Sequence, residues 1–258
     1  ATRIKDQAWL NRSVRGDRVA ITDVTSGYAV LGIMGPQARN ILSSLTPDDL
    51  ANKSFPYGHT REIEIGHARV RACRVSYVGE LGWELYIPRE FADHVYDQLR
   101  PAGLHPMGLH AIDSCRMEKG FKHWGHDIGI GDTPIEAGLS FTIDWDKPGG
   151  FVGRDAVMRQ RQGGVRRRVI QFEAPLEPLL LHEEPILRRG QHVGQTTSGA
   201  RGFRTRKNLC FASIEVPRGE PLETTLSGVY DILAEGKRYG LTPLKKPVYD
   251  PAGTKMKA

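Results

Sequence analysis

The chain has 258 residues, a length that suits two or three compact modules rather than a single core. Hydrophobic residues make up 39% and charged residues 26%, which are ordinary values for a globular protein, and no segment is of low complexity. No apolar run approaches the ~18 residues that a membrane-spanning helix needs. The net charge of +6 leaves nucleic acid as one possible partner.

The first half of the chain alternates between strand and helix patterns. Residues 28–33, 61–65 and 68–77 predict strands, because apolar and polar residues alternate along most of them. Helices are predicted from Pro36 to Leu45, from Pro88 to Leu99 and over residues 108–120, where apolar residues recur every three or four positions. This order predicts an α+β fold with a ferredoxin-like antiparallel sheet backed by helices.

The second half reads almost entirely as short strands. After a short helix at residues 154–160, Gln162-Gly163-Gly164 is the best linker candidate, and it predicts domains at residues 1–162 and 163–258. Gly, Pro and charged turns then separate the predicted strands. A small antiparallel β-barrel or jelly roll is expected. The strands are predicted at residues 168–173, 192–197, 208–216, 229–234 and 239–242.

The sequence motif most suggestive of binding is Ser76 to Pro88. Gly79 and Gly82 bracket a turn, and Trp83, Leu85 and Ile87 then share one face of the following strand. Glu84 and Tyr86 share the other face, where a carboxylate beside a phenol can recognise a flat polar ring. The alternative is an ordinary solvated strand face.

Several other charged residues and histidines have a structural explanation that requires no role in catalysis or metal binding. Glu80 is expected to hydrogen-bond the turn backbone rather than to act in catalysis, and Asp113 with Arg116 is expected to form a surface ion pair. The His123-x-x-His126-Asp127 spacing does not fit a zinc site, so we expect a buried histidine bound to the backbone and no metal.

Cysteine usage and charge distribution bear on location and partners. The three cysteines, at positions 73, 115 and 210, are odd in number and far apart, which favours a reducing compartment. We therefore expect a cytoplasmic protein or, in a eukaryote, one of the mitochondrial matrix. The basic excess concentrates at residues 166–168 and 201–207 without interleaved aromatic residues, so nucleic-acid binding is not expected.

Taken together, the motifs resemble a known family. Tyr77-x-Gly-Glu-x-Gly-x-Glu84 is similar to the signature of the folate-dependent aminomethyltransferases, the T-proteins of glycine cleavage. Residues 124–127 and 147–151 resemble the C-terminal, folate-binding part of dimethylglycine and sarcosine dehydrogenases. Supporting motifs come in the expected order at residues 23–26, 32–38, 113–120 and 153–156.

The resemblance implies a tetrahydrofolate site. It assigns folate contacts to Tyr77, Glu84, Leu85, Tyr86 and Phe141, although Phe141 lacks the hydroxyl that relatives can carry there. It assigns no catalytic group. T-proteins often have an arginine one residue before Asp113 that helps to hold folate. The residue at this position is Ile112, which argues against a plain glycine-cleavage enzyme and leaves the anchor of the folate tail unassigned.

The resemblance also implies an activity. In this family an oxidised N-methyl amine gives an iminium, and N5 of tetrahydrofolate captures its carbon as methylenetetrahydrofolate. The chain has no dinucleotide fingerprint, and Gly149-Gly150 is not a phosphate loop, so FAD is expected only in a separate flavin dehydrogenase domain or subunit. Folate, an N-methyl amine and that flavoprotein are the expected partners.

Two further expectations concern completeness and alternatives. The family motifs begin well inside the aminomethyltransferase region, so we expect a chain that is incomplete at its N-terminus and that alone has little demethylating activity. A non-catalytic regulatory or scaffolding relative is the first alternative function. A folate-dependent assembly or repair factor is the second.

Overall fold

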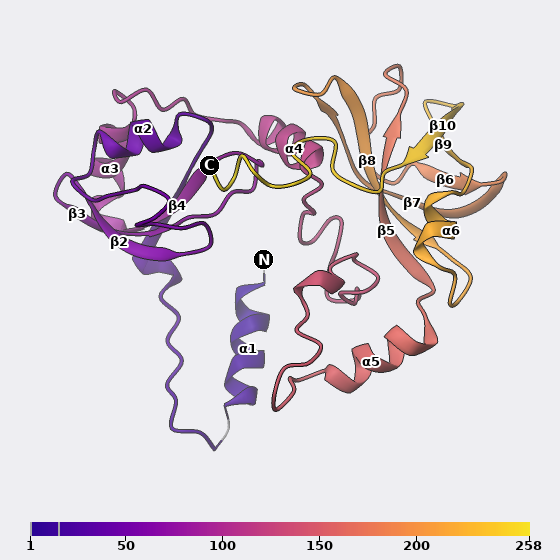
Figure 1. Cartoon of the computed structure of the whole chain (residues 1–258), viewed down its shortest axis with the longest axis horizontal. Helices are drawn as coiled ribbons and strands as arrows, with labels where there is room; N and C mark the ends of the chain where they lie inside the picture. The colour runs from indigo at the N-terminus through magenta and orange to yellow at the C-terminus, as the bar shows by residue number, and fades with distance from the viewer. Residues whose placement is uncertain (1, 15) are drawn as a thin grey trace. The chain divides into compact units, whose positions relative to one another are not determined.

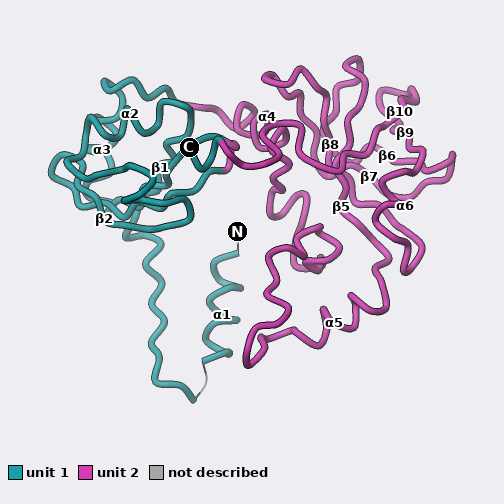
Figure 2. Tube along the Cα trace, in the orientation of Figure 1, with its two compact units in different colours: residues 1–76, 80–106, 255–258 teal, residues 77–79, 107–254 magenta. Residues whose placement is uncertain are grey.

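The computed structural model describes residues 2–14 and 16–258, which fall into two compact units (Figures 1 and 2). Unit 1 comprises residues 1–76, 80–106 and 255–258, and unit 2 comprises residues 77–79 and 107–254. The helix α5 (Arg154–Gly163) belongs to the same unit as the strands that follow it. A domain boundary at residue 162 stays a prediction.

Unit 1 is built on a four-stranded antiparallel sheet in the order β1-β4-β3-β2. The ferredoxin-like arrangement is wrong in its topology: β1 is an edge strand that pairs only with β4, and within the described part of unit 1 no strand follows the helix at Ala92–Leu99. The antiparallel sheet itself is confirmed. Its strands are β1 (Tyr28–Met34), β2 (Thr60–Ile65), β3 (Ala68–Cys73) and β4 (Gly82–Pro88).

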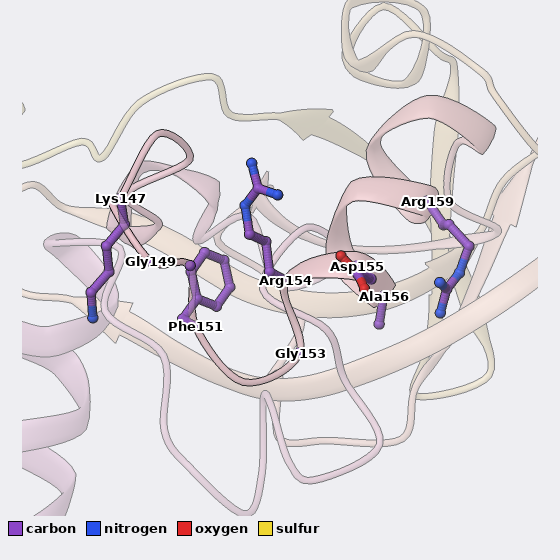
Figure 3. A pocket seen from close by; sticks show the side chains of 9 residues that line it. Lys147, Gly149, Phe151, Gly153, Arg154, Asp155, Ala156 and Arg159 are labelled. Atoms are coloured by element: carbon purple, nitrogen blue, oxygen red, sulfur yellow. The ribbon is translucent and has the colours of Figure 1, made fainter.

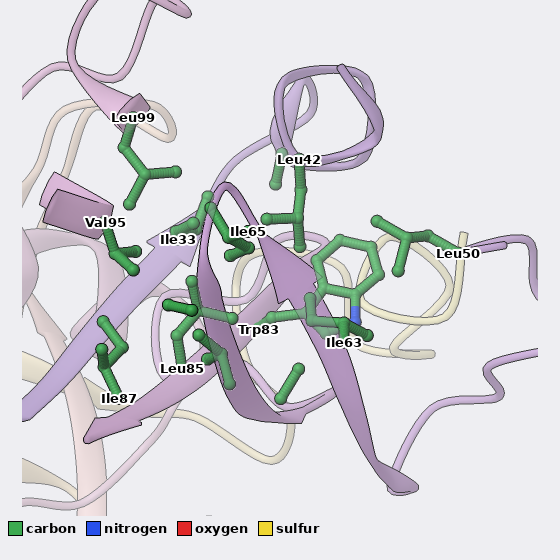
Figure 4. Packing of buried hydrophobic residues seen from close by; sticks show 14 of the residues in the cluster. Ile33, Leu42, Leu50, Ile63, Ile65, Trp83, Leu85, Ile87, Val95 and Leu99 are labelled. Carbon is green, nitrogen blue, oxygen red and sulfur yellow. The ribbon is translucent and has the colours of Figure 1, made fainter. Parts of the chain in front are cut away.

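One face of this sheet is covered by apolar side chains from two helices. Leu42 of α2 (Ala38–Ser43) and Val95 and Leu99 of α3 (Ala92–Leu99) pack on the buried face around Trp83 (Figure 4). Burial of each such side chain contributes about 1.5–3 kcal/mol. The remaining helical segments of unit 1 are α1 (Arg3–Ser13) and the 3₁₀ turns η1 (Thr25–Gly27) and η2 (Arg89–Phe91).

Unit 2 contains a closed antiparallel barrel in the order β10-β5-β8-β7-β6-β9. Because its strands close on themselves, the unit is a β-barrel and not a jelly roll, the two architectures that the sequence left open. One strand and one helix, β6 and α6, lie where no element was predicted. The barrel elements are β5 (Arg167–Ala174), β6 (Pro185–Arg188), β7 (Gln191–Gly202), β8 (Lys207–Glu215), α6 (Leu222–Leu226), β9 (Tyr230–Ala234) and β10 (Lys237–Pro243).

The helix α4 (Leu109–Glu118) packs against the barrel. Ser114 Oγ donates a hydrogen bond to the Arg201 carbonyl of β7 at 2.7 Å, and Met117 is fully buried. The unit also contains the 3₁₀ turn η3 (Ser140–Thr142). Among the described residues, no helix has both the length and the apolar character that would let it cross a bilayer.

The structure corrects two expectations about charged groups near α4. Arg116 is not on the surface: its side chain is 2% exposed, and besides Asp113 it binds Asp127, at 2.6 Å. The buried group of the histidine motif is Asp127 rather than a histidine, since His123 and His126 are both exposed. The spacing of three residues between Asp113 and Arg116 does not reveal that β7 covers this side of the helix.

Candidate functional site

The strand β4 divides its side chains between the core and an open face as its pattern predicts. Trp83, Leu85 and Ile87 are fully buried, whereas Glu84 and Tyr86 lie half-buried on the opposite face. The Tyr86 hydroxyl donates a hydrogen bond to Glu84 Oε2 at 3.0 Å. Of the predicted folate contacts in unit 1, the structure therefore brings Glu84 and Tyr86 together, while the Leu85 side chain lies in the core.

The residue that faces Glu84 across the neighbouring strand is a glycine. Gly32 of β1 is the residue directly opposite Glu84, and Val30 is opposite Tyr86. Residues directly opposite each other in an antiparallel pair point to the same face, so the residue opposite Glu84 contributes no side chain there. The carboxylate keeps lone pairs that accept further donors in addition to the Tyr86 hydroxyl.

A cleft of about 510 Å³, called the β4 cleft below, is lined by Tyr86 of this pair. Tyr86 and Val30 line one side, and Leu10 of α1 with residues 21–25 lines the other. Asp23 is part of this lining and accepts hydrogen bonds from the backbone N–H and hydroxyl of Thr25, at 2.9 and 2.6 Å. The Thr25 hydroxyl is the main reason why the pKa of Asp23 lies below its ordinary value.

Tyr86 is suited to donate rather than to ionise. Burial and the hydrogen bond to Glu84 raise the pKa of its phenol above the ordinary value, because both favour the neutral form. The phenol proton is donated to Glu84, so the pair offers the open face acceptor positions, on the carboxylate and on the phenol oxygen. This combination matches a flat heterocycle that presents adjacent N–H groups.

The other two predicted contacts belong to unit 2. The Tyr77 hydroxyl donates to the Lys122 carbonyl at 3.2 Å, and its ring stacks on Phe121 with 6.1 Å between centroids. Burial raises the pKa of Tyr77. Phe141 is 83% exposed, which leaves its ring free to pack on a ligand, the only role that its missing hydroxyl allows.

Phe141 lines a cavity of about 400 Å³ in unit 2, called the lysine cavity below. Four lysines from two segments line it as well: Lys119, Lys122, Lys245 and Lys246. Sequence reasoning did not identify this group, because the segments that carry the lysines are more than a hundred residues apart and only the barrel fold brings them together.

A second, wider depression lies at the start of α5 (Figure 3). It measures about 700 Å³ and is lined by Lys147, Arg154 and Arg159 together with Phe151. The backbone bends sharply in front of the helix, where Gly153 has φ 90°. The sequence does not match a phosphate loop in this segment, and no role is assigned to it. Among the described residues, no group of three His, Cys, Asp or Glu side chains could hold a metal ion.

Comparisons with known proteins agree with this fold. Residues 1–147 match the GCVT N-terminal domain, and residues 167–250 match the glycine cleavage T-protein C-terminal barrel domain. A solved structure of the aminomethyltransferase T of the glycine cleavage system from Bartonella henselae superposes with a TM-score of 0.80, at 21% identity, and covers 97% of this chain and 67% of that one. At this identity the likeness shows the fold.

Two curated relatives are more similar in sequence. The 4-methylaminobutanoate oxidase (formaldehyde-forming) of Paenarthrobacter nicotinovorans is 38% identical over 99% of this chain, and human mitochondrial sarcosine dehydrogenase is 36% identical over 92%. The chain spans only 31% and 26% of these two proteins. Because the two domains of the glycine cleavage T-protein match the two halves of the chain, the chain belongs to the GCVT family, the family of that protein.

Proposed function

We propose that the chain is the tetrahydrofolate-binding, one-carbon-transfer domain of a dimethylglycine- or sarcosine-dehydrogenase-like protein. Domains of this family bind tetrahydrofolate. The observation that carries the proposal is the Glu84–Tyr86 pair, which is hydrogen-bonded and half-buried, with a glycine, Gly32, opposite Glu84 and with Tyr86 lining the β4 cleft. In the proposed parent protein, the domain captures the carbon of an N-methyl amine as methylenetetrahydrofolate.

The donor and acceptor set fits the pterin end of a folate. A pterin presents a ring N–H and an exocyclic NH₂ side by side, and the Glu84 carboxylate can accept from both. Each such hydrogen bond to a charged group contributes about 1.5–3 kcal/mol. Tyr86 holds the carboxylate in place through its hydroxyl. When bound, tetrahydrofolate supplies the nucleophilic nitrogen, and the chain's own residues bind and orient it.

Tyr77 and Phe141 stay predicted contacts, and the flavin dehydrogenase part stays a predicted partner. Tyr77 is held by stacking and by its hydrogen bond to the Lys122 carbonyl, so its ring is positioned before a ligand arrives. Such preorganisation reduces the entropy lost on binding. A cytoplasmic or mitochondrial-matrix location remains part of the proposal.

The test is calorimetric titration of tetrahydrofolate into the wild-type chain and the Glu84→Gln variant. Glutamine keeps the shape but loses the charge and one acceptor, so we expect affinity to fall about 10- to 100-fold, the equivalent of about 1.5–3 kcal/mol. Glu62→Gln, which changes an exposed residue of β2 paired with Arg69, is the matched control and should bind as the wild type does.

Two results would contradict the proposal in different ways. Equal affinity of wild type and Glu84→Gln removes Glu84 from the site. Failure of the wild-type chain to bind tetrahydrofolate removes the function itself and favours the scaffolding alternative.

A further inference from the structure

Two arginines of unit 1, Arg39 and Arg74, converge on one oxygen atom. Arg39 lies on α2, and Arg74 directly follows the last residue of β3. The Nη2 atoms of both donate to the same oxygen of Ala258, at 2.7 and 2.6 Å. Residues 255–258 belong to unit 1, so the contact lies within one unit (Figure 2). The surroundings of that oxygen are called the arginine pocket below.

Arg74 is a charged residue at the centre of a core. Its side chain is 0% exposed, and its Nη1 donates to the Phe55 carbonyl at 2.6 Å. Its Nε atom is buried and has no acceptor among the described residues. Burial, and to a lesser extent the positive charge of Arg39, lower the pKa of Arg74. Both effects oppose the charged form of the guanidinium, so a negative group beside it would stabilise the site.

The other partners of the two guanidinium groups carry no negative charge. Arg39 donates to the Leu50 carbonyl at 3.0 Å and to Asn52 Oδ1 at 2.7 Å. Both guanidinium carbons lie over the Trp83 ring, 5.7 and 5.6 Å from its centroid, where an indole attracts a cation. In the part of the chain that the structure describes, no aspartate or glutamate pairs with either arginine.

This imbalance sets the kind of oxygen that the pocket prefers. Hydrogen bonds between a guanidinium and a carboxylate are about twice as strong as those between neutral groups. A buried cation that lacks an acidic partner is costly, and a carboxylate reduces that cost more than a carbonyl does. The two uncompensated charges therefore favour a carboxylate oxygen at the position where the Ala258 oxygen lies.

The segment that supplies the oxygen has one buried side chain. Met256 is 8% exposed, whereas Lys255, Lys257 and Ala258 are exposed. The segment is therefore held by an apolar side chain two residues before the oxygen that the arginines bind. Its two lysines bring no negative charge, so within residues 255–258 it is the Ala258 oxygen that complements the arginine pocket.

We propose that the arginine pocket is a recognition site for the carboxylate end of a peptide, and that its occupant in this chain is the segment 255–258. The guanidinium groups of Arg39 and Arg74 bind the carboxylate, and the buried position of Met256 adds an apolar contact. Capture of a terminal carboxylate is a recurring mode of peptide recognition. The pocket is made by residues of unit 1 alone, and the inference does not rest on the proposed function.

The first experiment measures by mass spectrometry how fast a carboxypeptidase removes Ala258 from the 258-residue chain. The protease must bind the terminal carboxylate itself, so the arginine pocket protects it. We expect Arg39→Gln to raise the rate about tenfold or more, because glutamine keeps a donor but loses the charge. Arg61→Gln is the matched control: Arg61 also donates to backbone carbonyls, but to those of Asp49 and Ser54, and its loss should leave the rate unchanged.

The second experiment separates recognition of a carboxylate from a general loosening of unit 1. Peptide ligation gives the full chain a terminal amide, which keeps every residue and removes the negative charge. The peptide Lys-Met-Lys-Ala is then titrated into this amidated chain as the free acid and as the amide. We expect the acid to bind about tenfold or more tightly than the amide, and this preference to disappear in amidated Arg39→Gln. The unmodified chain should bind the acid more weakly, because its own segment occupies the arginine pocket.

Two results would overturn the inference. The first is digestion of Arg39→Gln at the wild-type rate, which would mean that the arginine does not hold the carboxylate. The second is an amidated chain that binds neither peptide, or that binds both equally, which would mean that the arginine pocket does not recognise the charge of a chain end. Neither result bears on the Glu84 test, which reports tetrahydrofolate binding.

Discussion

Buried charges in unit 2 are paired, and Asp127 shows what such a pair does. Its carboxylate accepts hydrogen bonds from Arg116 of α4, from the hydroxyls of Thr197 and Ser198 on β7, and from the backbone N–H of His123. The group therefore joins a helix, a barrel strand and the loop that carries Phe121 and Lys122. Asp127 therefore fastens the start of this loop to α4 and to the barrel.

We expect Asp127→Ala to lower the free energy of unfolding by about 3–5 kcal/mol, because it removes the buried carboxylate from the Arg116 guanidinium and leaves only the half-exposed Asp113 as an acidic partner. Urea unfolding followed by circular dichroism measures the effect. Glu62→Ala is the control: its pair with Arg69 is 50% and 76% exposed, and such surface pairs contribute about 0–1 kcal/mol. Equal effects in the two variants would show that the burial of Asp127 is not decisive.

Glu220 gives the barrel a predicted dependence on pH. Arg188 donates to both oxygens of this carboxylate at 2.9 Å, and Thr225 donates at 2.8 Å. Burial alone would raise its pKa, but these hydrogen bonds lower the pKa below its ordinary value of 4.5. An acid whose pKa is lowered by folding contributes stability that is present above pH 4.5. This stability is lost as the pH falls below 4.5 and through the folded-state pKa.

We therefore expect Glu220→Gln to be less stable than the wild type at neutral pH and to lose less stability on acidification. Urea midpoints measured from about pH 7 to about pH 3 test this, because the difference between the two proteins should shrink as the acid is protonated. Glu223→Gln, which changes an exposed neighbour in α6, should follow the wild-type curve. A constant difference across the range would contradict the assignment.

At the scale of elements, the alternation of apolar and polar residues predicted the strands that a local sequence pattern specifies. The strand β4 and its two faces follow from the alternation at Trp83 to Ile87, and β1, β2 and β8 were predicted nearly in full. The strand β6 was not predicted, because it is only four residues long and carries a register shift between Ile186 and Leu187. The helix α1 buries none of its residues, so its apolar residues left only a weak pattern.

The candidate site was predictable only where one element carries it. Glu84 and Tyr86 lie on a single strand, so their common face could be predicted from spacing. The β4 cleft needs α1 and residues 21–25 beside that strand, and the lysine cavity needs residues such as Lys122 and Lys246 from distant segments. The burial of Arg116 likewise depends on β7, which comes much later in the chain. Contacts of this kind are set by tertiary packing, which local propensity does not encode.

The close packing of β7 against β8 leads to a prediction for Gly194 of β7. A Cβ at Gly194 would lie 2.0 Å from the Ser213 carbonyl oxygen, and its φ of 156° is unfavourable for other residues. We expect Gly194→Ala to lower the free energy of unfolding by about 2 kcal/mol or more, through strain and overpacking. Gly240→Ala is the matched control on β10, where nothing lies within 4 Å, and it should be close to neutral. Similar thermal midpoints for the two variants would refute the close approach of β7 and β8.

At the scale of the whole molecule, much of the positive charge has an internal role. The two basic runs bind groups of unit 2: Arg167 pairs with Asp132 at 2.6 Å, and Arg204 pairs with Glu118 at 2.7 Å. Arg168 donates to the Glu220 carbonyl at 2.9 Å. A net charge of +6 therefore overstates the charge that these runs offer to a polyanion.

The last prediction is that the chain does not bind nucleic acid appreciably at physiological salt. Electrostatic binding requires several free cations along one backbone path, and proteins that provide them reach dissociation constants of about 10⁻⁴–10⁻⁶ M without sequence specificity. Because arginines of both basic runs are held by acids and carbonyls, we expect affinity weaker than this range. Fluorescence anisotropy with labelled duplex and single-stranded oligonucleotides, at about 50 and about 150 mM salt, measures it. Arg201→Gln with Arg206→Gln serves as the comparison, since both side chains are exposed. Micromolar binding with a steep salt dependence that this double variant removes would show that the second basic run is a nucleic-acid interface after all.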